Sequence, residues 1–246
     1  MSAVFLREGW SKALASHEGQ VPRETGPAPL DVALIAKAGP WDDLSRYAEA
    51  VLDENRYISL VSRKNPEEII QHNILDSLLL VAAWLQVPRE TAPLFLDAGT
   101  GSGVPGIPAT LLCRHLGIEA SLILIESNEK KQGFLDRMAG DKADMHVFRG
   151  RLESERLPDF LQTLSTTGQV PVLTSRALAT ISRTLVWARG LRPHLQEALF
   201  FKGPETAEQE IREADQWESL GWRLEDQRAF YFPHRETRLL RLIPSS

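Results

Sequence analysis

The feature that most constrains the fold is a change of rhythm in the chain near residue 93. Beyond that point, short apolar runs alternate with stretches of helical length, and no strand pattern precedes it. Strands that alternate with helices predict a parallel sheet with helices on both faces. Strands are expected at 94–99, 121–126, 145–150, 170–177 and 197–203. Helices are expected at 105–116, 128–140, 180–192 and 205–219.

The two ends of the chain differ from this central pattern. "GWRLEDQRAFYF" and "TRLLRLI" read as two strands with no helix between them, so they predict an antiparallel hairpin. Before residue 93 the chain reads as helical, and Asn65 with Pro66 forms a start signal for one of its helices. We expect helices at 2–16, 31–56 and 66–86, and a turn-rich loop at 17–30. The chain therefore divides into a helical N-terminal segment, 1–91, and an α/β domain, 92–246.

Composition narrows the class of protein. The 246 residues are 43% hydrophobic and 25% charged, which is typical of a globular chain that buries a sizeable core. A net charge of −5 argues against a general nucleic-acid coat but leaves room for a local basic patch. The single cysteine, Cys113, excludes a disulfide framework and a cysteine-rich zinc site, and the six histidines are scattered. Without a signal-peptide pattern or a membrane-length apolar run, we expect a cytoplasmic protein that uses no metal.

"FLDAGTGSGVPGIPA", residues 95–109, is the candidate ligand loop, because ligands of open α/β sheets bind at the carboxyl ends of strands. Gly101, Gly103 and Gly106 fit a dinucleotide fingerprint, whereas the Gly-Lys-Ser/Thr of a P-loop is absent. Asp97 would repel a pyrophosphate and attract the cationic S-adenosylmethionine. Glu126 ends the next strand, where an acid binds ribose hydroxyls. NAD sites use that device too, so Glu126 indicates a ribose without choosing the cofactor.

A set of motifs in this order carries a family resemblance: "DAGTGSGVPGIP", "LIESNEKKQGFL", "RLES", "SRALA" and "FFKG". Over about residues 40–205 the chain resembles the GidB (RsmG) family of bacterial methyltransferases, which act on guanine N7 of 16S ribosomal RNA. The resemblance implies a class I S-adenosylmethionine-dependent methyltransferase: a Rossmann-like, mostly parallel seven-stranded sheet with a C-terminal antiparallel hairpin, behind a helical segment. It implies that the partner is 16S ribosomal RNA, within the small ribosomal subunit or its precursor.

The resemblance also assigns roles to single residues of the cofactor site. It places Gly99 and Val104 at the methionine part, Glu126 at the ribose, Leu152 and Glu153 near the adenine, and Arg176 in the active-site wall. The expected cofactor site is completed by four neighbouring residues and the strand-end acid: Thr100, Gly101, Gly103, Ser127 and Asp97.

Cations are the candidates for contact with the substrate. Arg176 and Lys202 end two strands and are the expected catalytic pair, holding guanine O6 or a phosphate. His72 lies one helical turn before Asp76 and is expected to pair with it. Further substrate contacts are expected from His72, Arg63, Lys64, Arg149 and Arg151. We expect these cations to form one basic face with Arg56 and Lys130, while Glu205, Glu208, Glu210 and Glu213 face away.

Three alternatives stay open at this point. The first is a methyltransferase for another substrate, either a small molecule or a protein. It stays open because the chain has "SLV" at 59–61 and "HN" at 72–73, where the family usually has Asn-Leu-Thr and Arg-His. An NAD(P)-dependent oxidoreductase and a non-catalytic RNA-binding protein with the same fold are the others. "SRAL" replaces the Asn/Asp-Pro-Pro-aromatic motif of exocyclic-amine methyltransferases, and Cys113 lies in a helix rather than at a strand end. Methylation of guanine N7 needs neither that motif nor a catalytic cysteine, because positioning alone can drive it.

Overall fold

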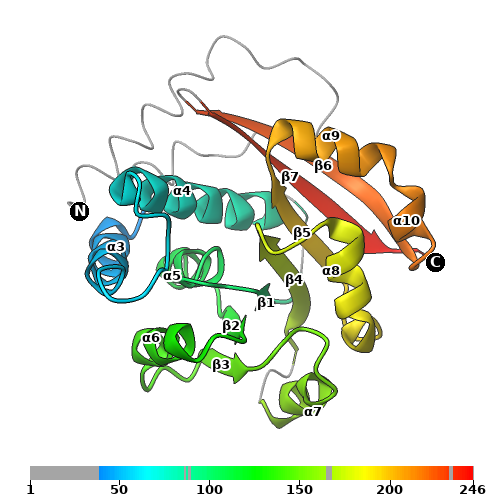
Figure 1. The fold of residues 1–246 in the computed structure, drawn as a ribbon. Coiled ribbons are helices and arrows are strands. Elements are labelled where there is room, and N and C mark those ends of the chain that lie inside the picture. The colour runs from blue at the N-terminus through cyan, green and yellow to red at the C-terminus, as the bar shows by residue number, and fades with distance from the viewer. Residues whose placement is uncertain (1–38, 86, 88–89, 165–167, 233–234, 246) are drawn as a thin grey trace.

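A seven-stranded sheet forms the centre of the molecule (Figure 1). The computed structural model describes residues 39–245 apart from 86, 88–89, 165–167 and 233–234. The strands lie in the order β3-β2-β1-β4-β5-β7-β6. Their bounds are β1 Pro93–Ala98, β2 Ser121–Glu126, β3 Met145–Arg149, β4 Val170–Arg176, β5 Glu197–Lys202, β6 Trp222–Phe232 and β7 Arg235–Pro244.

Strand direction agrees with the sequence prediction. The first five strands pair in parallel, whereas β7 runs antiparallel to both β5 and β6. All the expected strands are present, so the α/β class and the C-terminal hairpin are confirmed. Strand order reverses between β1 and β4, because the chain passes from β1 outward to β3 and then returns. Such a reversal opens a crevice at the carboxyl ends of the strands, which is where ligands of these sheets bind.

The helices match the expected pattern with three differences. The helix expected over 180–192 ends at Trp187 and is followed by a 3-10 turn at Arg189–Leu191. A short helix over 156–163, which contains Pro158, was not expected. The helix expected over 205–219 is split in two. Expected segments 2–16, 17–30 and 31–38 lie outside the described residues. The bounds are α3 Trp41–Glu54, α4 Pro66–Leu85, α5 Gly106–His115, α6 Glu129–Ala139, α7 Arg156–Thr163, α8 Ile181–Trp187, a 3-10 turn at Arg189–Leu191, α9 Pro204–Arg212 and α10 Asp215–Glu218.

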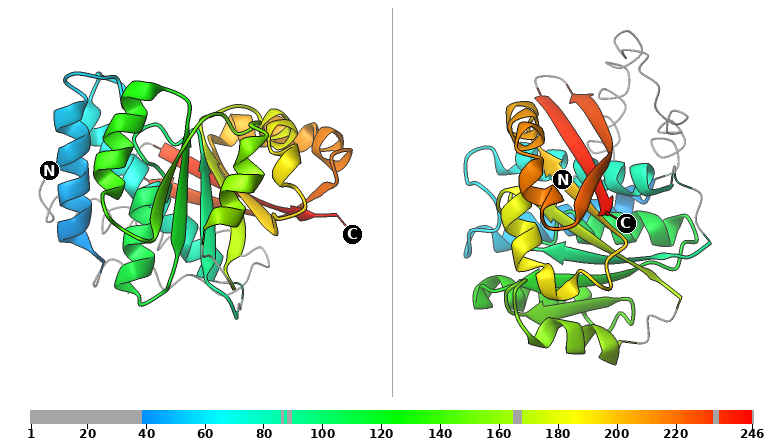
Figure 2. Two further views of the ribbon diagram at one scale, coloured as in Figure 1. Left: turned by 90° about the horizontal axis from the view of Figure 1, so that it is seen from below. Right: turned by 90° about the vertical axis from the view of Figure 1, so that its right-hand side faces the viewer.

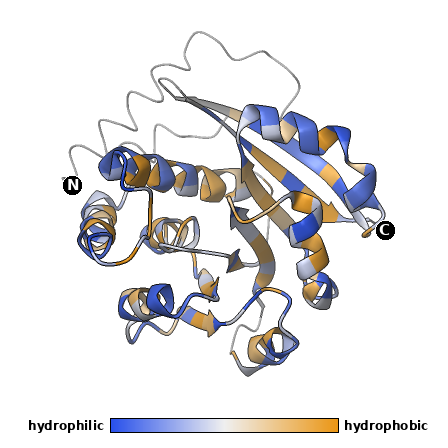
Figure 3. Ribbon diagram, in the orientation of Figure 1, coloured by the Kyte–Doolittle hydropathy of each residue, from blue (hydrophilic) through white to orange (hydrophobic). Residues whose placement is uncertain are grey.

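Two hydrophobic layers sandwich the sheet (Figure 2). Alternate residues along β1 enter opposite layers, with Phe95 on one side and Leu94 and Leu96 on the other, as the two-residue period of a strand requires. One layer is built with α3, α4, α5 and α6, and the other with α7, α8, α9 and α10. Figure 3 shows the apolar residues concentrated along the strands and on the helix sides that face them. Both faces are covered, as expected for a parallel sheet.

Helix α4 is buried almost all round in its second half. Leu78, Leu80, Val81 and Ala82 have no exposed surface, and they belong to the longest apolar run of the chain. A helix that is apolar on every side is a buried core helix. In the part of the chain that the structure describes, no helix is long and apolar enough to cross a membrane. Because α3 and α4 share one core with the sheet, the division of the chain at residue 91 stays a prediction.

Candidate active site

The strand ends bring the predicted site residues to one edge of the sheet. Glu126 at the end of β2 is level with Arg149 of β3, and Arg176 of β4 is level with Phe201 of β5. Ala98, which ends β1, lies between them, and the glycine loop begins at the next residue. The carboxyl edge therefore collects an acid, a glycine-rich loop and two arginines from separate parts of the sequence.

The loop after β1 needs its glycines for shape. Gly99, Gly101 and Gly103 have φ angles of 66°, 61° and 99°, in the left-handed region where glycine is strongly favoured. A Cβ on Gly103 would lie 2.3 Å from Ile107 Cδ1, so that side of the loop is filled. A Cβ on Gly101 would have only the Gly99 carbonyl oxygen nearby, at 3.9 Å. The loop is thus closed on its inner side and open at Gly101, where a ligand can approach the backbone.

Asp97 lies beneath this loop rather than at its mouth. Its side chain is fully buried, and Oδ2 accepts hydrogen bonds from Thr100 Oγ1 at 2.6 Å and from the Gly106 N–H at 2.9 Å. Oδ1 has no hydrogen-bond partner among the described residues. Burial raises the pKa of this carboxyl to about 7, and the nearby charge of Glu126 adds to the rise. Asp97 therefore holds the turn together. This corrects the expectation that its charge is accessible to attract the cofactor, because the side chain is buried. A direct contact between Asp97 and the cofactor stays a prediction.

Glu126 binds the outer side of the same loop. Its Oε2 accepts from the Gly101 N–H at 3.0 Å, and its Oε1 accepts from the N–H groups of Ser127 and Asn128, each at 2.9 Å. The Asn128 side chain then caps α6 by accepting from two backbone N–H groups of its first turn. Because a carboxylate offers about four acceptor positions, Glu126 can still accept a bond from a ligand hydroxyl. The acid joins the glycine loop to the start of α6, directly beside the open side of Gly101.

Tyr47 is a component of the site that the sequence did not indicate. Its hydroxyl, carried by α3, donates to the backbone oxygen of Ser102 in the glycine loop at 2.9 Å. Both residues are buried, and burial raises the pKa of the phenol above its usual range. The helical spacing of Leu44, Tyr47 and Val51 predicts a buried face, but nothing local in the sequence shows which partner that face meets.

Arg176 is held by an acid from the helical layer. Its Nε lies 3.2 Å from Asp76 Oδ2 on α4, with the arginine side chain 23% exposed and the aspartate 1% exposed. Arg176 was expected in the wall of the site, and its position at the carboxyl edge suits that role, which stays a prediction. His72, one turn before Asp76, is partly buried, and the expected contact between the two stays a prediction. The pair fixes α4 against the end of β4.

Lys202 is more enclosed than a substrate contact requires. Its Nζ lies 2.6 Å from Glu210 Oε1 and donates to the Ala179 carbonyl oxygen at 2.7 Å. The two side chains are 8% and 6% exposed, and Glu210 also accepts from the Ile181 N–H. Glu210 was expected to face away from the site; that prediction is wrong, because the buried ammonium requires a carboxylate partner. The catalytic role of Lys202 stays a prediction, and its observed contacts join β5 to α8 and α9.

The remaining expected cations lie among acids. Arg149 pairs with Asp136 at 2.6 Å, and the exposed Arg151 lies 3.7 Å from Glu153. Leu152, between Arg151 and Glu153, is buried in the core beside β3. Among the expected cations, Arg63, Lys64 and Lys130 are exposed and have no ion pair within the described residues. The expected single basic face stays a prediction, and its cations are interleaved with carboxylates.

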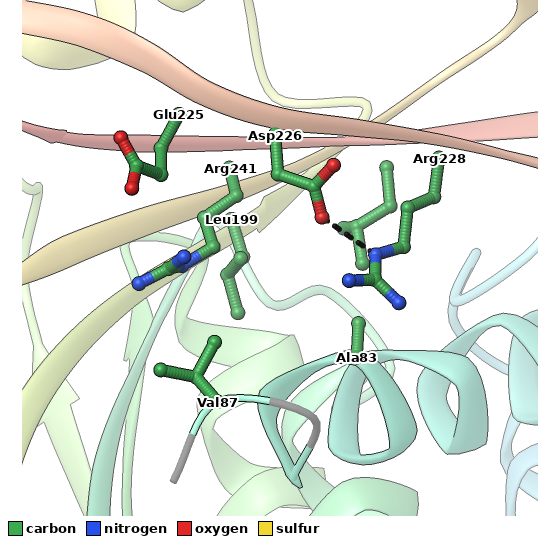
Figure 4. A pocket seen from close by; sticks show the side chains of 8 residues that line it. Ala83, Val87, Leu199, Glu225, Asp226, Arg228 and Arg241 are labelled. Carbon is green, nitrogen blue, oxygen red and sulfur yellow. Dashed lines mark hydrogen bonds and ion pairs between the residues drawn. The ribbon is translucent and has the colours of Figure 1, made fainter. Parts of the chain in front are cut away.

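A hollow lies away from this edge, between the end of α4 and the strands β5, β6 and β7 (Figure 4). Its volume is about 240 Å³. Arg228 and Arg241 line it, but each is paired at 2.6 Å, the first with Asp226 and the second with Glu197. Its other lining residues are Ala83, Val87, Leu199, Glu225 and Leu239. The hollow therefore offers an anion no uncompensated cation, and the loop edge remains the better candidate site.

Nucleophilic and metal chemistry find no support in the described residues. Cys113 is buried in α5, where burial raises the pKa of its thiol to about 12, so the reactive thiolate is strongly disfavoured. No group of three histidine, cysteine, aspartate or glutamate side chains is placed to hold a metal ion within the described ranges.

Comparisons with known proteins identify what this chain is similar to. The family model for GidB, rRNA small subunit methyltransferase G, matches residues 41–231. The chain is 32% identical to a ribosomal RNA small subunit methyltransferase G of Granulibacter bethesdensis, over 82% of this chain and 84% of that one. The enzyme of the same name from Solibacter usitatus is 31% identical over 74% and 76%. Among solved structures, magnesium protoporphyrin IX methyltransferase from Synechocystis PCC 6803 with bound SAH has a TM-score of 0.52 at 12% identity, covering 83% of this chain and 98% of that chain.

Proposed function

The chain belongs to the GidB family of rRNA small subunit methyltransferases, and we propose that it methylates N7 of a guanine in 16S ribosomal RNA with S-adenosylmethionine. The carrying observation is the glycine loop, closed from beneath by Asp97 and bound on its open side by Glu126. Family membership makes the chain a methyltransferase with RNA as its substrate. The choice of nucleotide, the N7 atom and action on the small subunit or its precursor in the cytoplasm belong to the proposal.

The donors of the loop favour S-adenosylmethionine over NAD. In a dinucleotide site, backbone N–H groups at the start of the first helix bind the pyrophosphate. Here the Gly101 N–H donates to Glu126 and the Gly106 N–H donates to Asp97, so both donors are already occupied by acids. No lysine or arginine lies in residues 99–106. An anion would meet the Glu126 carboxylate and lose these donors, whereas a cationic nucleoside is attracted by that carboxylate.

The cofactor would lie along the loop, with its ribose hydroxyls at Glu126 and its methionine part at Gly99 and Val104, as the family resemblance implies. When bound, S-adenosylmethionine supplies an electrophilic methyl group on a sulfonium. The N7 lone pair of guanine lies in the ring plane and is unprotonated at neutral pH, so the protein needs no general base. Its task is to hold N7 in line with that methyl group, and positioning of this kind contributes strongly to rate.

Arg176 is the residue placed best to hold the guanine. A guanidinium carries five N–H donors, and the bond from Nε to Asp76 leaves others for the O6 acceptor of the base. The guanine becomes cationic as its N7 is methylated, so an unpaired arginine would oppose the reaction. Because Asp76 compensates the charge of Arg176, the arginine can donate hydrogen bonds at a reduced electrostatic cost.

The segments that depart from the family pattern lie in the helical layer. At 59–61, the Asn55 side chain accepts from the N–H groups of Leu60 and Val61, which fixes the backbone of "SLV". At 72–73, Asn73 is buried within α4, one turn before Ser77. These segments contribute none of the hydrogen bonds that hold Glu126 and the glycine loop, which supports an unchanged cofactor. The experiment must therefore also detect methylation of a target other than 16S ribosomal RNA.

Mass mapping of ribosomal RNA tests the proposal. The gene is deleted in its source organism, and 16S RNA fragments are compared with those of the parent strain. We expect one guanine to lose a methyl group and to regain it when purified protein and S-adenosylmethionine are added to the deficient small subunits. Unchanged masses, with methylation of no RNA in vitro, would exclude the RNA substrate. Calorimetry with S-adenosylhomocysteine and with NAD tests the cofactor separately, and we expect heat of binding only with the former.

A further inference from the structure

Tyr57 stands out because it is the one aromatic residue among the strongly exposed large hydrophobic side chains of the described residues. It is 81% exposed, whereas Leu85, Leu116 and Val186 are 42%, 37% and 47% exposed. It lies in the connection between α3 and α4, residues 55–65. An aromatic ring held in water offers a flat apolar face to whatever binds there.

The exposure of Tyr57 is set by the surrounding backbone. The Tyr57 N–H donates to the Glu54 carbonyl oxygen at 2.9 Å, which continues the hydrogen bonding of the end of α3. Further along, Asn55 Oδ1 accepts from the N–H groups of Leu60 and Val61 at 2.9 and 3.0 Å. Leu60 and Val61 are themselves buried in the core. The connection is thus anchored on both sides of the ring, so the tyrosine is presented to solvent by a fixed frame.

Charge in this connection is purely positive. Residues 55–65 contain Arg56, Arg63 and Lys64 and no acid. Arg56 lies 3.3 Å from Asp53, whereas Arg63 and Lys64 are exposed and have no ion pair within the described residues. The acids that follow, Glu67 and Glu68, occupy the first turn of α4, where the helix dipole favours negative charge. The connection therefore combines one exposed ring with two uncompensated cations, the chemistry that binds single-stranded nucleic acid.

Both helices that the connection joins touch the candidate active site. Tyr47 of α3 donates to Ser102 in the glycine loop, and Asp76 of α4 pairs with Arg176 at the end of β4. The connection links these helices at one end of the helical layer (Figure 2). A strand of RNA with one base at the active site can therefore extend along this layer.

We propose that residues 55–65 bind the RNA substrate beside the target base, with Tyr57 stacking on an unpaired base and Arg63 and Lys64 contacting phosphates. This inference rests on the proposed RNA methylation and names a contact for it. Stacking reads no sequence, because every base has a flat face. The connection thus anchors a single-stranded stretch next to the guanine that Arg176 receives, and sequence choice is left to the site itself.

Binding and methylation by Tyr57→Ala and Tyr57→Phe test the stack, with deficient small subunits and their naked 16S RNA as probes. We expect Tyr57→Ala to weaken RNA binding about five- to a hundredfold, the loss found when a stacked base loses its ring. Tyr57→Phe keeps the ring and should bind within about twofold of the parent chain, as it retains the stacking face. Binding of S-adenosylhomocysteine should be unchanged in both. Leu116→Ala, a truncation of another exposed apolar residue after α5, is the matched control and should bind like the parent.

The double variant Arg63→Ala and Lys64→Ala tests the phosphate contacts. Loss of two contacts should reduce the slope of log affinity against log salt by about 1.4 to 1.8, whereas Tyr57→Ala should leave that slope unchanged. A photoreactive benzophenone side chain at position 57 identifies the occupant directly, and we expect cross-links to RNA nucleotides.

The outcomes separate this inference from the proposed function. If the parent chain methylates the subunit while Tyr57→Ala binds and reacts like it, the function stands and the stacking proposal is wrong. Cross-links only to a ribosomal protein also overturn it, since the occupant would then not be RNA. If the parent chain methylates no RNA, the proposed function itself fails.

Discussion

Two acids lie at the carboxyl ends of neighbouring strands, Asp97 next to last in β1 and Glu126 last in β2, and their surroundings differ. Asp97 is enclosed beneath the glycine loop, where two donors share one of its oxygens and the other oxygen has no hydrogen-bond partner among the described residues. Glu126 lies on the open side of the loop, where three backbone N–H groups divide between both of its oxygens. A strand-end acid is therefore not by itself a ligand contact. Its depth relative to the loop decides whether it supports the turn or faces what the turn binds.

The pH dependence of stability gives the largest expected difference between the two acids. The pKa of Asp97 is about 7 in the folded chain, above its ordinary value of 3.8, because burial opposes its charge. Between about pH 4 and pH 7 the folded chain holds this proton and the unfolded chain releases it, so Asp97 makes stability fall as pH rises and has no further effect above pH 7.

Asp97→Asn removes this dependence, because the amide oxygen still accepts from Thr100 and Gly106 and no proton is lost. Relative to the variant, the parent chain should lose about 4 kcal/mol of unfolding free energy between pH 4 and pH 8, as a rise of three pKa units implies. Urea unfolding of both proteins across this range measures the difference. Parallel curves would mean that Asp97 titrates normally and is not held in a desolvated site.

Removal of the outer acid should affect binding more than stability. Glu126→Ala should weaken S-adenosylhomocysteine binding about ten- to a hundredfold, since a lost charged hydrogen bond costs about 1.5–3 kcal/mol. The freed N–H groups of Ser127 and Asn128 lie in exposed residues and can bind water, so the melting temperature should change little. Titration calorimetry measures the affinity, with Glu129→Ala, an exposed acid in the next turn, as control. An unchanged dissociation constant would make Glu126 a loop anchor only, like Asp97.

Tyr47 offers a smaller test, because it holds the loop from a third side. Tyr47→Phe removes only the hydroxyl that donates to Ser102, and a single neutral hydrogen bond contributes about 1 kcal/mol. We expect cofactor affinity to fall about fivefold, the change that corresponds to about 1 kcal/mol. Ser45→Ala is the matched control, since Ser45 Oγ on the same helix is buried without a hydrogen-bond partner among the described residues. Equal affinities for the parent and Tyr47→Phe would show that the loop keeps its shape without α3.

The sequence predicted what depends on local pattern. Short apolar runs identified the strands, and the register of parallel strands brought Glu126 and Arg176 to the same edge. Contacts between distant elements could not be predicted in this way. Tyr47 meets Ser102 across 55 positions and Arg176 meets Asp76 across 100, and these distances are set by how α3 and α4 pack on the sheet. The burial of Asp97 was missed for the same reason, because loop depth is a tertiary property.

The smallest expected effect concerns the loop after β4, which makes a left-handed turn without a glycine. Ala177 has a φ angle of 57°, and a non-glycine residue in that region costs about 1 kcal/mol or more. The next residue, Leu178, fills the space where a Cβ on Gly99 would lie, at 2.5 Å, so this turn also shapes the inner side of the glycine loop. Ala177→Gly relieves the strain, but it adds freedom to the unfolded chain that offsets about 0.4–1 kcal/mol of the gain. We expect a net rise in unfolding free energy of about 0.5 kcal/mol by urea titration, with cofactor affinity within about twofold of the parent.

Gly117→Ala is the opposite control, since Gly117 has a φ of 73° with nothing within 4 Å of the position a Cβ would take, and its substitution should destabilise by strain alone. A fall in stability for Ala177→Gly would show that the alanine methyl group contributes more at this turn than its strain costs.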